Sequence, residues 1–245
     1  MTMGRIICAG LGPGDPELMS VRADRVVRAA RHVAYFRKAG RPGQARRIVA
    51  GMLAEGCAEH AMEYPVTTEA PFDSLGYIRL LSAFYDHWAD RLARLAQTAE
   101  VVVLCEGDPF FYGSFMHLYT RLRGRVCVEV IPGVTGMSAC WTLSGEPITW
   151  GDDVLTVLTG TLPEEDLVRR MTDADALVVM KTGRNLPKVR RALARAGRLE
   201  GAWLVERGTM EGQRIARLAD VEAADCPYFA IVLAHGHGRR PEAAA

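Results

Sequence analysis

The sequence predicts an α/β protein made of two α/β domains with mostly parallel or mixed sheets. Short apolar runs rich in β-branched residues alternate with segments whose apolar residues recur at helical spacing. Most of these runs end in turns rich in glycine and proline. The number of strand–helix units is too irregular for a TIM barrel, and Gly124 opens a second alternating series. We therefore expect domains over 1–122 and 123–236, and a disordered tail over 237–245.

The composition indicates a globular protein with a sizeable core. Of 245 residues, 49% are hydrophobic, and 30 basic side chains balance 29 acidic ones. The near-zero net charge argues against a broad surface for nucleic acid or anionic membrane. No apolar run approaches the ~20 residues that a membrane helix needs. We expect a cytoplasmic protein that binds neither nucleic acid nor membrane.

The first half contains the clearest strand and the clearest helix. Glu100–Cys105 holds five apolar residues, three of them valine, as is typical of a buried parallel strand. Apolar residues along 72–97 step by three and four, which places them on one helical face that we expect to meet the core. This stripe consists of Ile78, Leu81, Tyr85, Trp88, Leu92 and Leu95. The other expected elements are strands over Arg5–Leu11, His32–Phe36 and near His60, and helices from the N-cap Ser20 to about Arg31, over 43–55 and up to about Arg123.

The second half repeats the alternation. Strands are expected over Arg125–Ile131, Val154–Leu158, Asp175–Lys181 and Ala202–Glu206, and helices over 135–141 and 186–196. Thr161 and Glu164 match a capping box at the start of a further helix. Gln213–Leu218 and Tyr228–Ala234 are expected to close the sheet as an antiparallel pair.

Cysteine and histidine do not predict a metal site. The six cysteines include no CxxC pair, and Cys8, Cys105 and Cys127 lie in apolar strand-like runs where a thiol is usually buried. His235 and His237 are close together but too few to hold a metal, and we expect them in a solvated terminus.

Three loops follow predicted strands and are rich in glycine, proline and aspartate. They are Gly10–Asp15, Glu106–Pro109 and Pro132–Thr135. In open α/β sheets, ligands bind beyond the carboxyl ends of the strands, and glycine there lets the backbone approach a ligand closely. Any one of these loops alone is more often a plain tight turn.

A dinucleotide site is only a weak alternative for the first loop. The third glycine of the fingerprint is replaced by Asp15, and Pro13 removes an amide donor that a pyrophosphate would use. The second strand ends at Arg37, without an acid to bind a ribose diol.

Together, the three loops resemble the ordered motifs of the tetrapyrrole (corrin/porphyrin) methylases. The matching segments are Ala9–Ser20 (AGLGPGDPELMS), Glu106–Gly113 (EGDPFFYG) and Ile131–Thr135 (IPGVT). The similarity spans nearly the whole chain, through Asp175–Lys181 and Pro227–Ala234. Tyr64–Glu69 and Cys105–Met116 are similar to the members that methylate C20 of precorrin-2 to give precorrin-3A in aerobic cobalamin biosynthesis.

The resemblance implies that S-adenosylmethionine binds in the cleft between the two domains of a homodimer. Carried over by motif, the residues expected at the cofactor are Glu106, Gly107, Asp108, Phe111, Tyr112, Thr135, Gly136, Met180 and Ala230. Those expected at the tetrapyrrole are Gly12, Pro13, Gly14, Tyr35, Arg37, Lys38 and Arg46.

Methyl transfer to an electron-rich carbon needs mainly positioning and exclusion of water, without a metal or a covalent nucleophile. No residue identifies itself as the proton acceptor, and Glu106 and Asp108 are candidates by location only. The acetate and propionate arms of the substrate need local cations, which Arg37, Lys38, Arg41 and the Arg46–Arg47 pair supply unless they form an ordinary solvated loop.

Three alternatives stay open at this point. The substrate could be the cobalt form of precorrin-2. The chain could be another methylase of the fold, such as diphthine synthase or the ribosomal RNA type. It could also bind a tetrapyrrole or a nucleotide without catalysis.

Overall fold

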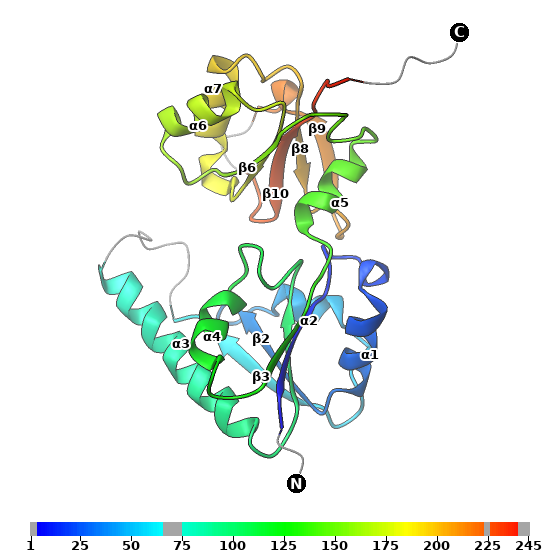
Figure 1. Cartoon of the computed structure of the whole chain (residues 1–245), viewed down its shortest axis with the longest axis vertical. Helices are drawn as coiled ribbons and strands as arrows, with labels where there is room; N and C mark the ends of the chain where they lie inside the picture. The colour runs from blue at the N-terminus through cyan, green and yellow to red at the C-terminus, as the bar shows by residue number, and fades with distance from the viewer. Residues whose placement is uncertain (1–3, 66–74, 223–225, 240–245) are drawn as a thin grey trace. The chain divides into compact units, whose positions relative to one another are not determined.

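The computed structural model describes residues 4–65, 75–222 and 226–239, and it divides the chain into two compact units. The first unit runs to Thr135 and the second begins at Gly136 (Figure 1). Each unit is a five-stranded sheet with helices on both faces, so the predicted fold of two α/β domains is confirmed.

The sheet of the first unit is parallel throughout, in the order β3-β2-β4-β1-β5. Its strands are β1 (Ile6–Gly10), β2 (His32–Arg37), β3 (Ala58–Glu63), β4 (Val101–Cys105) and β5 (Val128–Ile131). Its helices are α1 (Val21–Ala29), α2 (Gln44–Ile48), α3 (Leu75–Leu95) and α4 (Phe115–Leu122), with a 3-10 turn over Pro16–Leu18. The central strands β1 and β4 are buried along their whole length.

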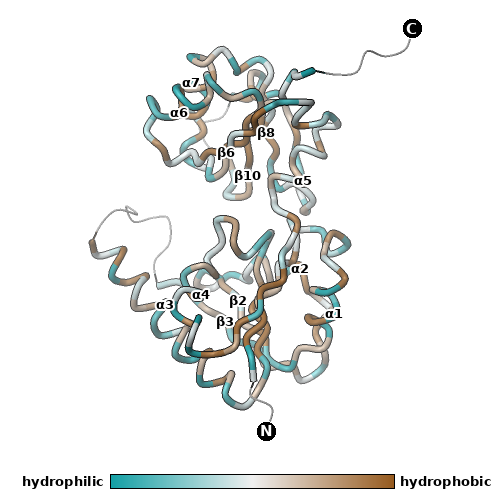
Figure 2. The backbone as a smooth tube through the Cα atoms, viewed as in Figure 1, coloured by the Kyte–Doolittle hydropathy of each residue, from teal (hydrophilic) through white to brown (hydrophobic). Residues whose placement is uncertain are grey.

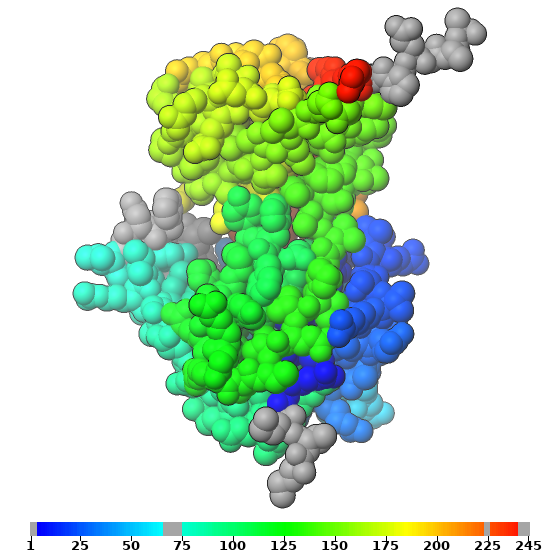
Figure 3. Space-filling model, viewed as in Figure 1, coloured from blue at the N-terminus to red at the C-terminus, as the bar shows by residue number. Residues whose placement is uncertain are grey.

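Two hydrophobic layers form because successive strand residues point to opposite faces. Ile7 and Leu104 pack with residues of α1 and α2 on one face. Ile6 and Val103 pack with residues of α3 and α4 on the other face. The strands therefore form the most hydrophobic part of the backbone trace (Figure 2). In the space-filling view, the cyan atoms of α3 and the green atoms of α4 lie side by side over the first unit (Figure 3).

The sheet of the second unit is mixed, in the order β6-β7-β10-β8-β9. Its strands are β6 (Leu155–Thr159), β7 (Ala176–Met180), β8 (Ala202–Glu206), β9 (Arg214–Arg217) and β10 (Ala230–Ala234). Helices α6 (Glu164–Thr172) and α7 (Leu186–Arg195) cover one face, and α5 (Gly136–Leu143) packs on the other. Two 3-10 turns lie at Gly183–Asn185 and Leu218–Asp220.

Strand β5 corrects the expected domain boundary. Arg125–Ile131 was expected in the second domain, but Ile6 of β1 pairs with Val128 and Ala9 pairs with Ile131. The chain therefore completes the first sheet before it enters the second unit. Gly124 is a turn with φ of 79° inside the first unit, and it is not a joint between domains.

The closing strands also differ from expectation. β10 lies between β7 and β8 and is antiparallel to both, while β9 pairs with β8 alone. The expected β9–β10 pair is therefore wrong, because β8 separates the two strands.

Of the two predicted helix caps, the N-cap at Ser20 is confirmed and the capping box at Thr161 is wrong. The Ser20 hydroxyl accepts from the Ala23 N–H at 3.2 Å, as an N-cap does. Helix α6 begins only at Glu164, after Pro163, while the Thr161 hydroxyl bonds to Thr159 at 3.0 Å. The capping box is therefore not formed.

The structure reverses the expected burial of three side chains: Ile78 and Cys127 were expected to be buried, and His235 was expected to be solvated. Ile78 is 51% exposed near the start of α3, and Cys127 is exposed in the turn before β5. His235 is buried, and its Nε2 lies 2.8 Å from the Ser144 Oγ.

Helix α2 ends at Ile48, far short of the expected residue 55, and Gly51 follows with φ of 76°.

No helix in the described ranges is both long and apolar enough to cross a membrane. Of the expected tail, 240–245 lies outside the described residues, as do 66–69 of the Tyr64–Glu69 motif.

Candidate active site

The three glycine-rich loops lie at one edge of the first sheet. They follow β1, β4 and β5, which are neighbouring parallel strands, so their carboxyl ends share an edge. The Gly107 N–H donates to the Gly12 carbonyl at 2.7 Å, which joins the first loop to the second. The three loops therefore meet at one edge within the first unit.

Asp108 braces two of these loops. Its Oδ2 accepts from the Gly133 N–H at 3.0 Å, across to the loop after β5. Its Oδ1 accepts from the Phe110 N–H at 2.8 Å and closes a turn within its own loop. Both carboxylate oxygens are thus engaged by the backbone, so this side chain orders the loops.

Glycine is required here by contacts between backbones. A Cβ at Gly133 would lie 2.1 Å from the Gly107 carbonyl oxygen, and one at Gly10 would lie 2.6 Å from the Gly133 nitrogen. Gly12 and Gly107 have φ of 79° and 62°, which other residues rarely adopt. The motif glycines therefore let three strand ends approach one another, a role that the sequence analysis had assigned to approach of a ligand.

Aromatic side chains follow Asp108 in the loop after β4, which we call the braced loop. Phe110 is 46% exposed and Tyr112 is 42% exposed, while Phe111 is half-buried. Tyr112 also has φ of 54°, a strained conformation for a residue with a Cβ. Such outliers concentrate at functional sites. Phe110 was missed in the sequence analysis, although its place between Asp108 and Phe111 could have suggested it.

The Glu106 side chain contacts the start of α2. Its Oε1 accepts from the Ala45 N–H at 3.1 Å. Burial raises the pKa of its carboxyl group, and the hydrogen bonds from backbone N–H groups oppose that rise only in part. Glu106 therefore connects the end of β4 to the first turn of α2.

A hollow of about 560 Å³ lies beside the carboxyl end of β2. It is lined by Tyr35, Arg37, Gly40, Arg41, Pro42, Arg46, Arg47, Ala50 and Glu59. It contains three of the residues predicted at the tetrapyrrole, Tyr35, Arg37 and Arg46. Lys38 is exposed and is not among its lining residues.

Two of these arginines already have acidic partners. Arg46 binds both carboxylate oxygens of Glu59, at 2.8 and 2.9 Å, and Arg37 pairs with Glu63 at 3.0 Å. The hydrogen bond from Arg46 lowers the pKa of Glu59. Burial, followed by a hydrogen bond to Glu59, raises the pKa of Tyr35.

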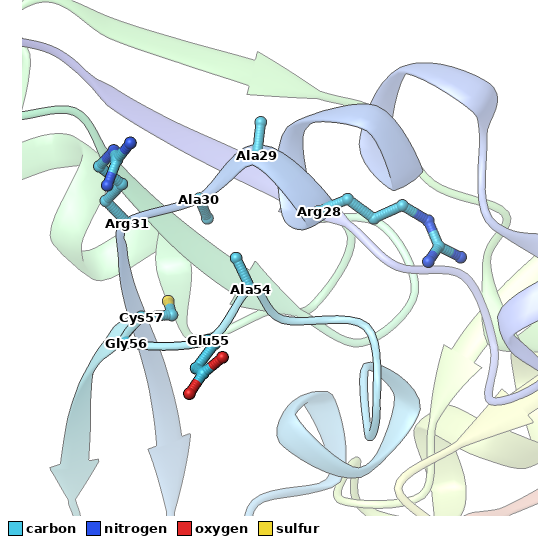
Figure 4. A pocket seen from close by; sticks show the side chains of 8 residues that line it. All are labelled: Arg28, Ala29, Ala30, Arg31, Ala54, Glu55, Gly56 and Cys57. Atoms are coloured by element: carbon cyan, nitrogen blue, oxygen red, sulfur yellow. The ribbon is translucent and has the colours of Figure 1, made fainter.

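A second hollow, of about 340 Å³, lies at the opposite edge of the sheet, where β2 and β3 begin. The side chains of Arg28 and Arg31 extend to opposite sides of it, and it is lined by Arg28, Ala29, Ala30, Arg31, Ala54, Glu55, Gly56 and Cys57 (Figure 4). Since its polar groups do not converge, we do not place the active site there.

The predicted cofactor residues of the second unit lie at one edge of its own sheet. Met180 ends β7 and Ala230 begins the antiparallel β10. The buried Thr182 hydroxyl donates to the Ala230 carbonyl at 2.9 Å, and Lys181 has φ of 54°. Thr135 ends the first unit and Gly136 begins α5, so they connect the two units in the chain.

Among the described residues, no three histidine, cysteine, aspartate or glutamate side chains are grouped as metal ligands would be.

The family model of the Tetrapyrrole (Corrin/Porphyrin) Methylases matches residues 5–222. The chain belongs to the tetrapyrrole methylase family. A precorrin-2 C(20)-methyltransferase from a Sinorhizobium species is 50% identical over 240 residues, which cover 98% of both chains. A cobalt-precorrin-2 C(20)-methyltransferase from Salmonella typhimurium is 26% identical and covers 94% of this chain and 95% of that protein.

A solved structure extends the similarity to a methylase with bound product. The uroporphyrin-III C-methyltransferase from Thermus thermophilus, complexed with S-adenyl homocysteine, is 27% identical to this chain, with a TM-score of 0.65. The match covers 94% of this chain and 97% of that one. The tetrapyrrole methylase fold therefore runs through both units.

Proposed function

We propose that this tetrapyrrole methylase transfers a methyl group from S-adenosylmethionine to C20 of precorrin-2, a step of cobalamin biosynthesis. The 50% identity to a precorrin-2 C(20)-methyltransferase, over 98% of both chains, supports this substrate. The 26% identity to the enzyme that acts on cobalt-precorrin-2 makes the metal-free substrate the better candidate. The resemblance also leads us to propose a cytoplasmic homodimer, which light scattering and cell fractionation check.

The observation that carries the proposal is the joining of the loops after β1, β4 and β5. Residues separated by many positions in the chain, Gly12, Asp108 and Gly133, are connected there by backbone and carboxylate hydrogen bonds. In open α/β sheets this edge is where ligands bind. Two exposed aromatic rings, Phe110 and Tyr112, adjoin it and offer apolar surface to an adenine or a methionine chain.

The residues fit S-adenosylmethionine by their chemistry. We assign it to the loop edge of the first unit, through Gly107, Asp108, Phe111 and Tyr112. Bound there, S-adenosylmethionine would supply an electrophilic methyl group on a positively charged sulfur. Thr135, Gly136, Met180 and Ala230 remain the predicted contacts in the rest of the chain.

The protein's contribution is positional. The Asp108 carboxylate orders the loop after β4 through two N–H donors, and the positive φ of Gly107 sets its direction. A rigid loop lowers the entropy cost of holding two reactants in line. Gly12, Pro13 and Gly14, in the joined first loop, remain our assignment on the tetrapyrrole side.

The experiment is incubation of the protein with S-adenosylmethionine labelled at the methyl carbon and, separately, with precorrin-2 and cobalt-precorrin-2. NMR of the product locates the label. We expect it on C20 of the metal-free substrate. Transfer to the cobalt form alone would show that cobalt-precorrin-2 is the substrate. Label at another carbon would show that the protein methylates a position other than C20. Binding of both ligands without methyl transfer would refute an enzymatic role.

A further inference from the structure

The hollow beside β2 carries more positive charge than its acidic neighbours neutralise. Four arginines line it, and Arg46 and Arg37 are paired with Glu59 and Glu63. The guanidinium groups of Arg41 and Arg47 form no hydrogen bond or ion pair with the described part of the chain. The unneutralised charge of the hollow therefore belongs to these two residues.

Next to Arg41 and Arg47, the hollow is lined by residues that are already held by one another. Both oxygens of Glu59 bind Arg46, and the Tyr35 hydroxyl is hydrogen-bonded to the same carboxylate. Arg47 follows Arg46 in α2, and Arg41 lies in the loop before that helix. A new anion would therefore be bound by Arg41 and Arg47 without breaking the ion pair of Glu59.

The hollow lies close to the loop edge that we assign to methyl transfer. β2 is the neighbour of β4 in a parallel sheet, so both strands end at the same edge. The Glu106 carboxylate, one residue before Gly107, binds the Ala45 N–H in the first turn of α2. Helix α2, which carries Arg47, is thus directly connected to the strand end that leads into the braced loop.

We propose that Arg41 and Arg47 bind carboxylate side arms of the tetrapyrrole and so determine substrate affinity. This inference rests on the proposed function. It replaces the sequence-based assignment of Arg37 and Arg46 as the direct contacts, because those two already have carboxylate partners. The guanidinium fork suits a carboxylate better than the single ammonium of Lys38, which does not line the hollow.

The test is the double variant Arg41→Gln, Arg47→Gln beside Arg28→Gln as the matched control. Arg28 is also an exposed arginine, but it pairs with Asp24 and lines the hollow at the other edge. We expect the double variant to raise KM for precorrin-2 about tenfold, since exposed charge pairs contribute on the order of fivefold or less each. The kcat and the Kd for S-adenosylmethionine should not change.

A binding measurement separates this inference from the proposed function. Uroporphyrin III, a stable tetrapyrrole with acetate and propionate arms, is titrated by fluorescence into wild type and variants at two salt concentrations. We expect weaker binding and a smaller salt dependence in the double variant only. The doubly conservative variant Arg41→Lys, Arg47→Lys should recover part of the affinity.

Each outcome decides one of the two claims. If wild type methylates precorrin-2 but the double variant keeps its KM and its uroporphyrin III affinity, the hollow is not a substrate site. An equal loss of uroporphyrin III affinity in Arg28→Gln would also overturn the inference. So would a competition experiment in which inorganic phosphate displaces uroporphyrin III at the same concentration as a tricarboxylate does, because the hollow would then not select carboxylates. If wild type does not methylate precorrin-2 but only the double variant loses uroporphyrin III, the proposed function fails and the tetrapyrrole site stands.

Discussion

The Asp108 carboxylate accepts a hydrogen bond from the backbone N–H of Gly133, 3.0 Å away, and so joins the loops after β4 and β5. The same carboxylate closes a turn with the Phe110 N–H at 2.8 Å. One side chain thus orders two of the three loops that the family motifs mark.

Asp108→Ala should weaken S-adenosylmethionine binding and lower the free energy of unfolding by about 1–3 kcal/mol, because two backbone donors lose a charged acceptor. Calorimetric titration and urea unfolding measure the two effects. Asp152→Ala is the control, since Asp152 is 84% exposed and pairs only at the surface with Arg239. Unchanged cofactor affinity in Asp108→Ala would show that the loops stay in place without the brace.

Gly107→Val should abolish S-adenosylmethionine binding at concentrations near the wild-type Kd. A Cβ at φ of 62° costs about 1–3 kcal/mol in backbone strain, and the branched side chain adds bulk at the loop edge. Gly124→Val separates the two effects. Gly124 has φ of 79°, and a Cβ there would meet nothing within 4 Å, so it should lose stability without losing cofactor affinity. Equal cofactor binding by both variants would reduce the Gly107 loop to a plain turn.

The strand-and-loop skeleton was predictable because it depends on local patterns. β4 is apolar on both faces, as a central parallel strand requires, and its apolar run marks it in the sequence. The glycines of the first and third loops mark the positions where backbones pack against each other. These features are encoded within short segments.

The mistakes arose where the partner lies far away in the chain. Nothing in Val128–Ile131 says that β1 is its neighbour, and this pairing moves the domain boundary. Similarly, Arg46 and Arg37 look available in the sequence, because Glu59 and Glu63 come from the next strand. Only the register of β2 against β3 reveals that Arg41 and Arg47 are the arginines left over.

Glu59→Gln should strengthen tetrapyrrole binding. The substitution removes the carboxylate that neutralises Arg46, so one more cation becomes available in the hollow. Uroporphyrin III titration should give a lower Kd and a steeper salt dependence than wild type. Glu63→Gln is a weaker counterpart on the neighbouring pair with Arg37. A higher Kd in Glu59→Gln would mean that the Glu59 pair is needed to shape the hollow.

Acid should destabilise the fold through two histidines. Burial, as the main cause, lowers the pKa of His60 and of His235 below the ordinary 6.5. The unfolded chain then takes up protons that the folded chain does not, so stability falls as the pH drops through about 6.5 toward the lowered values. His60→Gln and His235→Gln should each flatten the decline in unfolding free energy over that window. A decline as steep in both variants as in wild type would assign it to the carboxylates.

Glu106→Gln should be more stable than wild type, and the difference should be larger at neutral pH than in mild acid. Burial raises the pKa of Glu106, so the folded chain holds this proton to higher pH than the unfolded chain does. The resulting stability is fully present below the unfolded pKa of about 4.5 and is lost as the pH rises through the folded value. Glutamine keeps an oxygen for the Ala45 N–H and carries no charge, so the difference in unfolding temperature between the variant and wild type should grow with pH. Glu106→Ala is the companion variant: it leaves the Ala45 N–H without its acceptor and should be less stable than Glu106→Gln at every pH. If the two variants melt together, the carboxylate does not hold α2 against the end of β4.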